Sequence, residues 1–265
     1  MWSMPFKINL DPFSADHYFT VREHILVYKS HGGLQIKLES IALKLRNLLG
    51  IPQRLGLNIL PISAKEELAN SLENFYILDS PNDVLRKNSG SIKNGSVDIS
   101  FSFPQCTSMD MASANLVAID SNLSFGIPNN FYFVLSERNL SEFNPYSAEK
   151  LEQAHQEELY LISNVLDDYK EKQLEVLLRE SNYKSAVINQ LFESHRRLEP
   201  VGEKIDRSKS VLLAKCDRAF CQQIEGLGYV IHARDWNEGS MIAIANYPTH
   251  SKEMIEMFAD RVSEI

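Results

Sequence analysis

From Ser147 to about Leu198 the sequence contains few helix breakers, and this long stretch constrains the fold more than any other feature. Its apolar residues recur at spacings of three and four, the period that places side chains on one face of an α-helix. Ser147 is a favourable residue for the N-terminal cap of such a helix. We predict two helices with a break near Ser181 and Asn182, and one continuous helix is the alternative.

Before Pro145 the pattern is different, with short apolar runs separated by residues typical of turns. Residues 96–103 alternate between polar and apolar side chains, which indicates a strand with one buried face and favours antiparallel pairing. Further candidate strands are 55–60, 116–119 and 131–135. A helix is predicted over 34–48, and Gly50 and Pro52 mark its end.

The C-terminal part is predicted to combine helices with a β-hairpin. Residues 208–226 are predicted to be helical and to end at the glycines that follow. The runs 229–236 and 241–247 flank a glycine-containing turn, a spacing typical of a hairpin. A last helix is predicted after Thr249, with Ile255, Phe258 and Val262 facing inward.

Together these patterns predict an α+β fold. The N-terminal half is expected to be sheet-rich with mainly antiparallel strands, the middle helical, and the C-terminal part a β-hairpin plus a helix. The change of pattern at Pro145 predicts two domains, 1–145 and 146–265. Alternatively, the late hairpin pairs with the first sheet and joins the two halves.

Composition limits the classes of function. The chain has 265 residues and a formal net charge of −8, which disfavours a general phosphate-binding surface. No basic region followed by an apolar run stands near the N-terminus, so no signal peptide is expected. The apolar runs are also too short to span a membrane, and no membrane contact is expected. We therefore expect a cytoplasmic protein.

Three residues on the first run of the hairpin segment are the first candidates for catalysis. They are His232, Arg234 and Asp235. Alternation along a strand places His232 and Arg234 on one face and Asp235 on the other. A solvated sheet face explains the same pattern, and it is the reading that the sequence favours.

No metal site and no cofactor are expected. Glu152 and His155 have the spacing used in carboxylate-bridged di-iron bundles, but the second copy that such bundles need is missing. His17, His24 and His31 recur every seven residues, yet the glycines after His31 argue against one continuous helix. The glycine-rich loops that cradle phosphates are absent from the sequence.

The chain has three cysteines, which cannot form a disulfide framework. Cys216 and Cys221 are five residues apart on a predicted helix, so we expect their side chains to point to different faces. Their spacing also misses the C-x-x-C pattern of redox motifs, and we interpret them as small buried apolar residues. Cys106 lies in a predicted loop and would need a nearby base to act as a nucleophile.

A cluster of basic residues follows the long helical segment. Those that can contact phosphate are Arg196, Arg197, Arg207 and Lys209. The same cluster can instead pair with the acidic residues of the 147–180 segment. We favour this internal pairing, because the chain as a whole is negative.

The apolar ridge of the helical segment leads to the predicted function. We predict a non-catalytic interaction or assembly subunit of a larger intracellular complex that binds a protein partner or itself. The predicted contact residues are Leu159, Ile162, Leu166, Val187 and Leu191.

Two other functions stay open. One is an enzyme whose site lies near the late hairpin or in the N-terminal sheet domain, including a divergent nuclease or hydrolase. The other, which the sequence does not favour, is a nucleic-acid-binding factor with a winged-helix-like C-terminal part.

Overall fold

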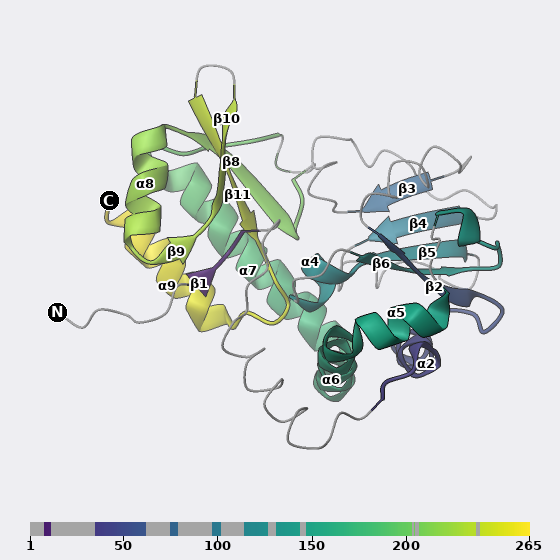
Figure 1. Ribbon diagram of the computed structural model, residues 1–265. Coiled ribbons are helices and arrows are strands. Elements are labelled where there is room, and N and C mark those ends of the chain that lie inside the picture. Colours follow the sequence, from purple (N-terminus) through teal and green to yellow (C-terminus); the bar gives the residue numbers. More distant parts are fainter. Residues whose placement is uncertain are drawn as a thin grey trace.

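The computed structural model describes residues 8–11, 35–61, 75–78, 97–101, 114–126, 131–143, 147–202, 204, 207–236 and 239–265. Within these residues the strands form a five-stranded sheet, a four-stranded sheet and a two-stranded pairing, and long helices connect the two larger sheets (Figure 1). The α+β class predicted from the sequence is confirmed. Within the described residues, no helix combines the length and the apolar character that a membrane-spanning segment requires.

The first sheet has five strands in the order β2-β6-β5-β4-β3. The strands are β2 (Gly56–Pro61), β3 (Phe75–Leu78), β4 (Val97–Phe101), β5 (Ala114–Asp120) and β6 (Phe131–Ser136). β3, β4 and β5 pair in parallel, whereas β6 runs antiparallel to both β5 and β2. Two of the four pairings in this sheet are thus antiparallel, as the sequence led us to expect, and the other two are parallel. Alternation of polar and apolar residues indicates a strand with one buried face, but it does not show whether the adjacent strand runs parallel or antiparallel to it.

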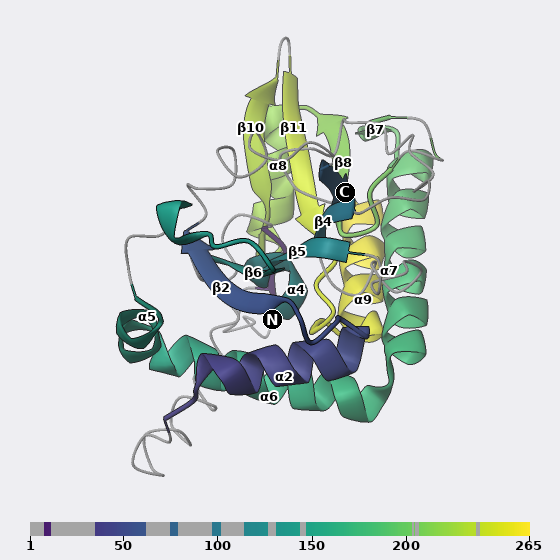
Figure 2. The same ribbon diagram turned by 90° about the vertical axis from the view of Figure 1, so that its right-hand side faces the viewer.

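Helices cover one face of this sheet. They are α2 (Leu38–Leu49), α5 (Ala148–Ala154) and α6 (Gln156–Lys172). α2 lies along α6 beneath the sheet (Figure 2), and both helices share a buried cluster with Ile59, Val117 and Phe133. The predicted stop of α2 is confirmed, because Gly50 adopts a left-handed φ of 67°. The opposite face packs against Leu140 and Phe143, next to the short helix η4 (Ser141–Phe143).

The second sheet is antiparallel throughout and has the order β10-β11-β8-β7. Its strands are β7 (Glu199–Pro200), β8 (Val211–Cys216), β10 (His232–Trp236) and β11 (Gly239–Ala245). The hairpin predicted from the sequence is confirmed by β10 and β11. This sheet packs against helices α7 (Leu174–Ser194), α8 (Arg218–Gly226) and α9 (Lys252–Ser263). In α9, Ile255, Phe258 and Val262 are fully buried, as predicted.

The structure corrects the prediction of one helix over 208–226. Residues 211–216 form the interior strand β8, and α8 begins only after Asp217. Val211, Leu212, Leu213 and Ala214 are all buried because the sheet is covered on both faces. A short apolar run of this kind cannot be assigned to a strand or a helix by its periodicity.

The predicted break in the long helical segment also lies elsewhere. The chain bends at His155, where α5 gives way to α6, and at Gln173, where α6 gives way to α7. Gln173 has a φ of 66°, which is uncommon for a residue other than glycine. Ser181 lies inside α7, where its backbone oxygen and hydroxyl both accept from the Asn246 amide.

The N-terminal segment joins the C-terminal half of the fold. β1 (Ile8–Asn9) pairs in parallel with β9 (Tyr229–Val230). The Ala245 amide donates to the Leu10 oxygen at 2.8 Å, and the Tyr247 hydroxyl donates to the Asp11 oxygen at 2.7 Å. Residues 8–11 are therefore fixed by residues more than two hundred positions later.

The start of α2 is held by side chains from α5 and α6. Lys37, at the N-terminal cap of α2, makes no side-chain cap hydrogen bond of its own. The Glu152 carboxylate accepts from the Leu38 amide at 2.8 Å and from Lys37 Nζ at 3.2 Å. Gln156 makes two hydrogen bonds with the backbone of Ile36. Glu152 thus supplies both the cap and the negative charge that favour a helix N-terminus.

Replacing Glu152 with Ala should destabilise the protein by about 1 kcal/mol, the usual cost of a lost N-terminal cap. Urea unfolding followed by circular dichroism measures this change. Glu149→Ala is the matched control, because Glu149 is an exposed acid on the same helix. Equal stability of the two variants would contradict the capping role of Glu152.

Candidate functional site

The carboxyl ends of the parallel strands meet at one edge of the first sheet. In Figure 1 the strands β3, β4 and β5 point towards the half that contains the second sheet. Open sheets with parallel strands bind their ligands outside this edge. The short helix α4 (Ser121–Phe125) begins directly after β5 and occupies this position.

The side chains of α4 are packed tightly between the two halves. Ser121 and Ser124 are fully buried, and the Tyr169 hydroxyl donates to the Ser124 backbone oxygen at 2.7 Å. Burial raises the pKa of Tyr169, and the carboxylate of Asp168 adds to this effect. Leu123 packs with Leu213, Ala243 and other residues on one face of the second sheet. α4 therefore connects the edge of the first sheet to the face of the second.

His232 and Arg234 share that face of the second sheet. His232 pairs with Ala243 and Arg234 with Met241, and directly paired residues project to the same side. Because Ala243 and Met241 cluster with Leu123, this is the side that faces α4. Asp235 pairs with Ser240, so it lies on the other face, as alternation predicted. That these three residues are catalytic stays a prediction.

His232 has a carboxylate partner that the sequence did not reveal. Its Nδ1 lies 3.6 Å from Asp11 Oδ1, an ion-pair distance that is too long for a hydrogen bond. The Asp11 side chain is only 14% exposed, and Asn9 Oδ1 accepts from the Asp11 amide. No sequence pattern links two residues so far apart, because β1 reaches this position only through its pairing with β9.

The basic cluster is largely paired within the fold. Arg197 makes two hydrogen bonds to the Asp217 carboxylate and lies over the Phe220 ring at 4.5 Å. Arg207 donates to Glu193, which also accepts from Lys204 and has a lowered pKa because of these two bases. The predicted internal pairing thus uses acids outside the 147–180 segment. Arg196 and Lys209, the other two candidates for phosphate contact, have exposed side chains.

The residues considered for metal binding have other roles or lie outside the description. Glu152 caps α2, and His155 Nδ1 lies 3.8 Å from Glu158 Oε1. In the described part of the chain, no group of three or more His, Cys, Asp or Glu side chains is arranged to hold a metal ion. The other candidates, His17, His24, His31 and Cys106, lie outside the described residues.

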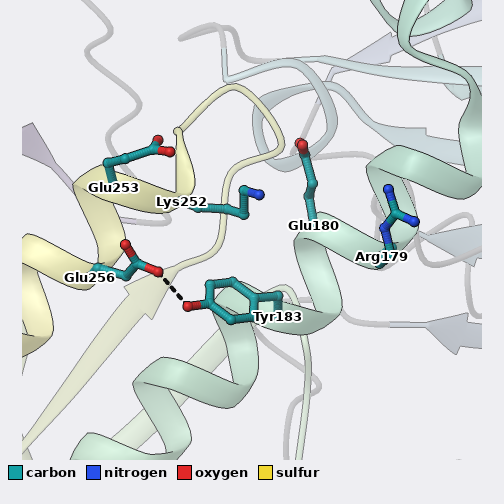
Figure 3. A pocket seen from close by; sticks show the side chains of 6 residues that line it. All are labelled: Arg179, Glu180, Tyr183, Lys252, Glu253 and Glu256. Carbon is teal, nitrogen blue, oxygen red and sulfur yellow. Dashed lines mark hydrogen bonds between the residues drawn. The ribbon is translucent and has the colours of Figure 1, made fainter.

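A surface pocket of about 400 Å³ lies between α7 and α9 (Figure 3). It is lined by Arg179, Glu180, Tyr183, Lys252, Glu253 and Glu256. The Tyr183 hydroxyl donates to the Glu256 carboxylate, and this hydrogen bond raises the pKa of Tyr183. The bases and acids of the lining largely offset one another, so the pocket does not select a ligand by its charge.

Lys184 of α7 is 1% exposed and donates to two backbone oxygens, those of Tyr247 at 2.6 Å and His250 at 2.9 Å. Burial lowers its pKa to about 8, Glu180 opposes this shift, and Lys172 adds to it. The lysine therefore joins α7 to the segment after β11, and it changes charge close to neutral pH.

The lowered pKa of Lys184 predicts how stability depends on pH. An unfolded lysine titrates near pH 10.4, so above pH 8 the folded chain has released a proton that the unfolded chain still binds. Between about pH 8 and 10 this group should make stability rise with pH, by up to about 1.4 kcal/mol per unit. Denaturant unfolding of wild type and Lys184→Met measures the difference, and identical pH slopes would contradict this prediction.

No protein-family model and no curated protein sequence matches the chain. Solved structures do. A phosphoserine aminotransferase from Cytophaga hutchinsonii superposes with a TM-score of 0.71 at 15% identity, covering 97% of this chain and 98% of that one. The chain has an aminotransferase fold. Ureidoglycine–glyoxylate aminotransferase from Bacillus subtilis gives a TM-score of 0.64 at 9% identity, covering 99% and 93%. A PLP-bound phosphoserine aminotransferase from Trichomonas vaginalis gives 0.62 at 9% identity, covering 86% and 87%.

This likeness overturns the function predicted from the sequence, a non-catalytic interaction or assembly subunit. The structures that share the fold along nearly the whole chain are enzymes. The predicted contact ridge is also covered by the fold itself. Leu159, Ile162 and Leu166 are buried in the first core, Leu191 is buried in the second, and Val187 packs against it. Their helical spacing reflects residues that face the protein's own core, which is the more common meaning of such a pattern.

Pyridoxal phosphate enzymes hold their cofactor through a Schiff base to a lysine. At the edge described above, the residues do not fit this arrangement. The sequence has no lysine between Lys93 and Lys150, so the connections that leave β4 and β5 contain none. Leu123 and Phe125 are buried there instead, and Phe125 packs against Phe133 and Tyr169.

Lysines elsewhere do not change this conclusion for the described residues. The buried Lys184 is on α7 and donates to backbone oxygens. Lys65, Lys87 and Lys93, which follow β2 and β3 in the sequence, lie outside the described residues.

Incubation with pyridoxal phosphate and then borohydride should therefore leave no lysine stoichiometrically modified. Intact-protein mass spectrometry measures the modification, and peptide mapping locates it. A lysine-linked aminotransferase treated in parallel is the positive control. One pyridoxyl group per chain on a single lysine, whether Lys65, Lys87, Lys93 or Lys184, would contradict this prediction.

Proposed function

We propose that the chain is an enzyme that transfers a proton on a small carboxylate-bearing substrate, an amino acid or a 2-oxo acid, with His232 as the base. The pairing of His232 with Asp11, on the sheet face that looks towards α4, is the observation that carries this proposal. Solved structures of the same fold are named for such substrates, among them phosphoserine and glyoxylate.

The geometry around His232 suits a general base. The negative charge of a carboxylate 3.6 Å from Nδ1 favours the tautomer with the proton on that nitrogen, which leaves Nε2 to accept a proton from a substrate. The backbone of Asp11 is held at both of its polar groups: its amide donates to Asn9 Oδ1, and its backbone oxygen accepts from the Tyr247 hydroxyl. The His232 side chain is 32% exposed, and this leaves it accessible to a small molecule.

Arg234 gives the site a means of binding a carboxylate. It lies two residues from His232 on the same face, and a guanidinium matches the geometry of a carboxylate. The proposed division of roles is that Arg234 binds and orients the substrate while His232 removes the proton. The reaction needs no lysine-linked cofactor, in agreement with the residues at the edge of the first sheet.

Hydrogen exchange in D₂O tests this function directly. A panel of amino acids and 2-oxo acids is incubated with the protein. Proton NMR follows the loss of the hydrogen on the α-carbon of each amino acid, or on the carbon beside the carbonyl group of each 2-oxo acid. His232→Ala should lower the exchange rate at least ~100-fold, the usual contribution of a general base. Asp11→Asn should lower kcat more than it raises KM, whereas Arg234→Gln should mainly raise KM.

His155→Ala is the matched control, because His155 also lies near a carboxylate and has a side chain that is 33% exposed. Its exchange rate should equal that of the wild type, and all variants should keep the wild-type melting temperature within a few degrees. The proposal fails if the wild type exchanges no member of the panel, or if His232→Ala exchanges as fast as His155→Ala.

A further inference from the structure

Cys216 and Cys221 lie next to each other, contrary to the expectation from the sequence. Their Sγ atoms are 3.0 Å apart. The prediction placed both residues on one helix, where a spacing of five separates the side chains. In the structure Cys216 is the last residue of β8 and Cys221 lies in the second turn of α8. The turn between strand and helix therefore brings the two sulfurs together.

Asp217 fixes this turn. Its carboxylate accepts from the Phe220 amide at 2.8 Å, which makes it the N-terminal cap of α8. Arg197 binds the same carboxylate and also donates to Gln223 at 2.6 Å. Because the cap sits between the two cysteines in the sequence, these contacts hold the thiols at their short separation.

The two thiols differ in access and in acidity. Cys221 is 3% exposed, whereas Cys216 is half-buried and can be reached from solvent. The hydrogen bond that the two thiols share lowers the pKa of Cys221 and raises the pKa of Cys216. The pair thus loses its first proton more readily than an isolated cysteine, and the remaining proton can move between the two sulfurs.

We propose that Cys216 and Cys221 form a redox-active dithiol that reacts with low-molecular-weight disulfides and ends as an intramolecular disulfide. A disulfide bond is about 2 Å long, so the sulfurs need to approach by roughly 1 Å. This site is independent of the chemistry assigned to His232.

The reaction is a pair of thiol–disulfide exchanges. Once the shared proton has moved to the Cys221 sulfur, the Cys216 thiolate attacks one sulfur of a small disulfide, forms a mixed disulfide and releases one small thiolate. Cys221 then gives up this proton, and its thiolate attacks the Cys216 sulfur and releases the second small thiolate. The two cysteines are oxidised by two electrons, the small disulfide is reduced to two thiols, and these take up the two protons that the cysteines lose.

The sequence allows a direct assay with oxidised glutathione as the probe. Trypsin cleaves after Lys215, Arg218 and Arg234, which places the two cysteines on separate peptides, 216–218 and 219–234. After treatment of the native protein, alkylation and digestion, a disulfide is the one bond that joins these peptides. The wild type should lose two of its three thiols and yield the joined peptide.

Single substitutions test the order of the steps. Cys221→Ser should stop at a mixed disulfide, with one glutathione on peptide 216–218. Cys216→Ser should react at least tenfold more slowly at residue 221, because that thiol is buried. Cys106→Ser removes the third cysteine and should leave the joined peptide unchanged.

The same treatment in denaturant is the control for the role of the fold. The proposal is overturned if native wild type keeps both thiols, or if glutathione adds to either cysteine without forming the joined peptide. Equal yields of the joined peptide in native and denatured protein would also overturn it, because the fold would then contribute nothing to the pairing.

Discussion

The bend at Gln173 decides where the two sheets lie relative to each other. α6 is part of the core beneath the first sheet, and α7 is part of the core of the second. A positive φ at a non-glycine residue costs about 1–3 kcal/mol and persists only where the surroundings enforce it. Here the surroundings are two separate cores, together with the bonds from Lys184 and Asn246 that fasten α7 to the segment after β11. Every contact between α4 and the second sheet depends on this bend.

The chain has the aminotransferase fold, but at the carboxyl edge of its parallel strands buried side chains fill part of the space where such folds bind ligands. Where a lysine-linked cofactor would need space and an amine, the residues after β5 provide buried apolar side chains. The polar side chains of the proposed site lie on β10 and in the N-terminal segment. A shared fold therefore constrains the place of a site more strongly than the chemistry performed there.

The sequence predicted the elements whose signals are local. Gly50, Ser147 and the inward residues of α9 were identified correctly because caps and helical periods act within a few residues. β8 was missed because both of its faces are buried, which removes the alternation by which strands are recognised. The break was predicted near Ser181, but hydrogen bonds from Asn246 to Ser181 hold this residue inside α7. The bend lies instead at Gln173, where packing between distant parts of the chain causes it and no local sequence signal marks it.

In the candidate site, alternation along the strand correctly placed His232 and Arg234 on one face. No local sequence signal predicted that Asp11 lies beside His232. Asp11 reaches His232 through a strand pairing that spans most of the chain, and Cys216 reaches Cys221 only once β8 is known to be a strand.

The pairing of β1 with β9 has a consequence for how the protein is made. On the ribosome, residues 8–11 emerge long before their partners at 228–230 and 245–247, which follow more than two hundred positions later. Closing so large a loop costs chain entropy before stabilising contacts form, so we expect this pairing to form late in folding. The first sheet can assemble during synthesis, whereas Asp11 and His232 meet only after the segment that contains β9 and β10 has also been translated.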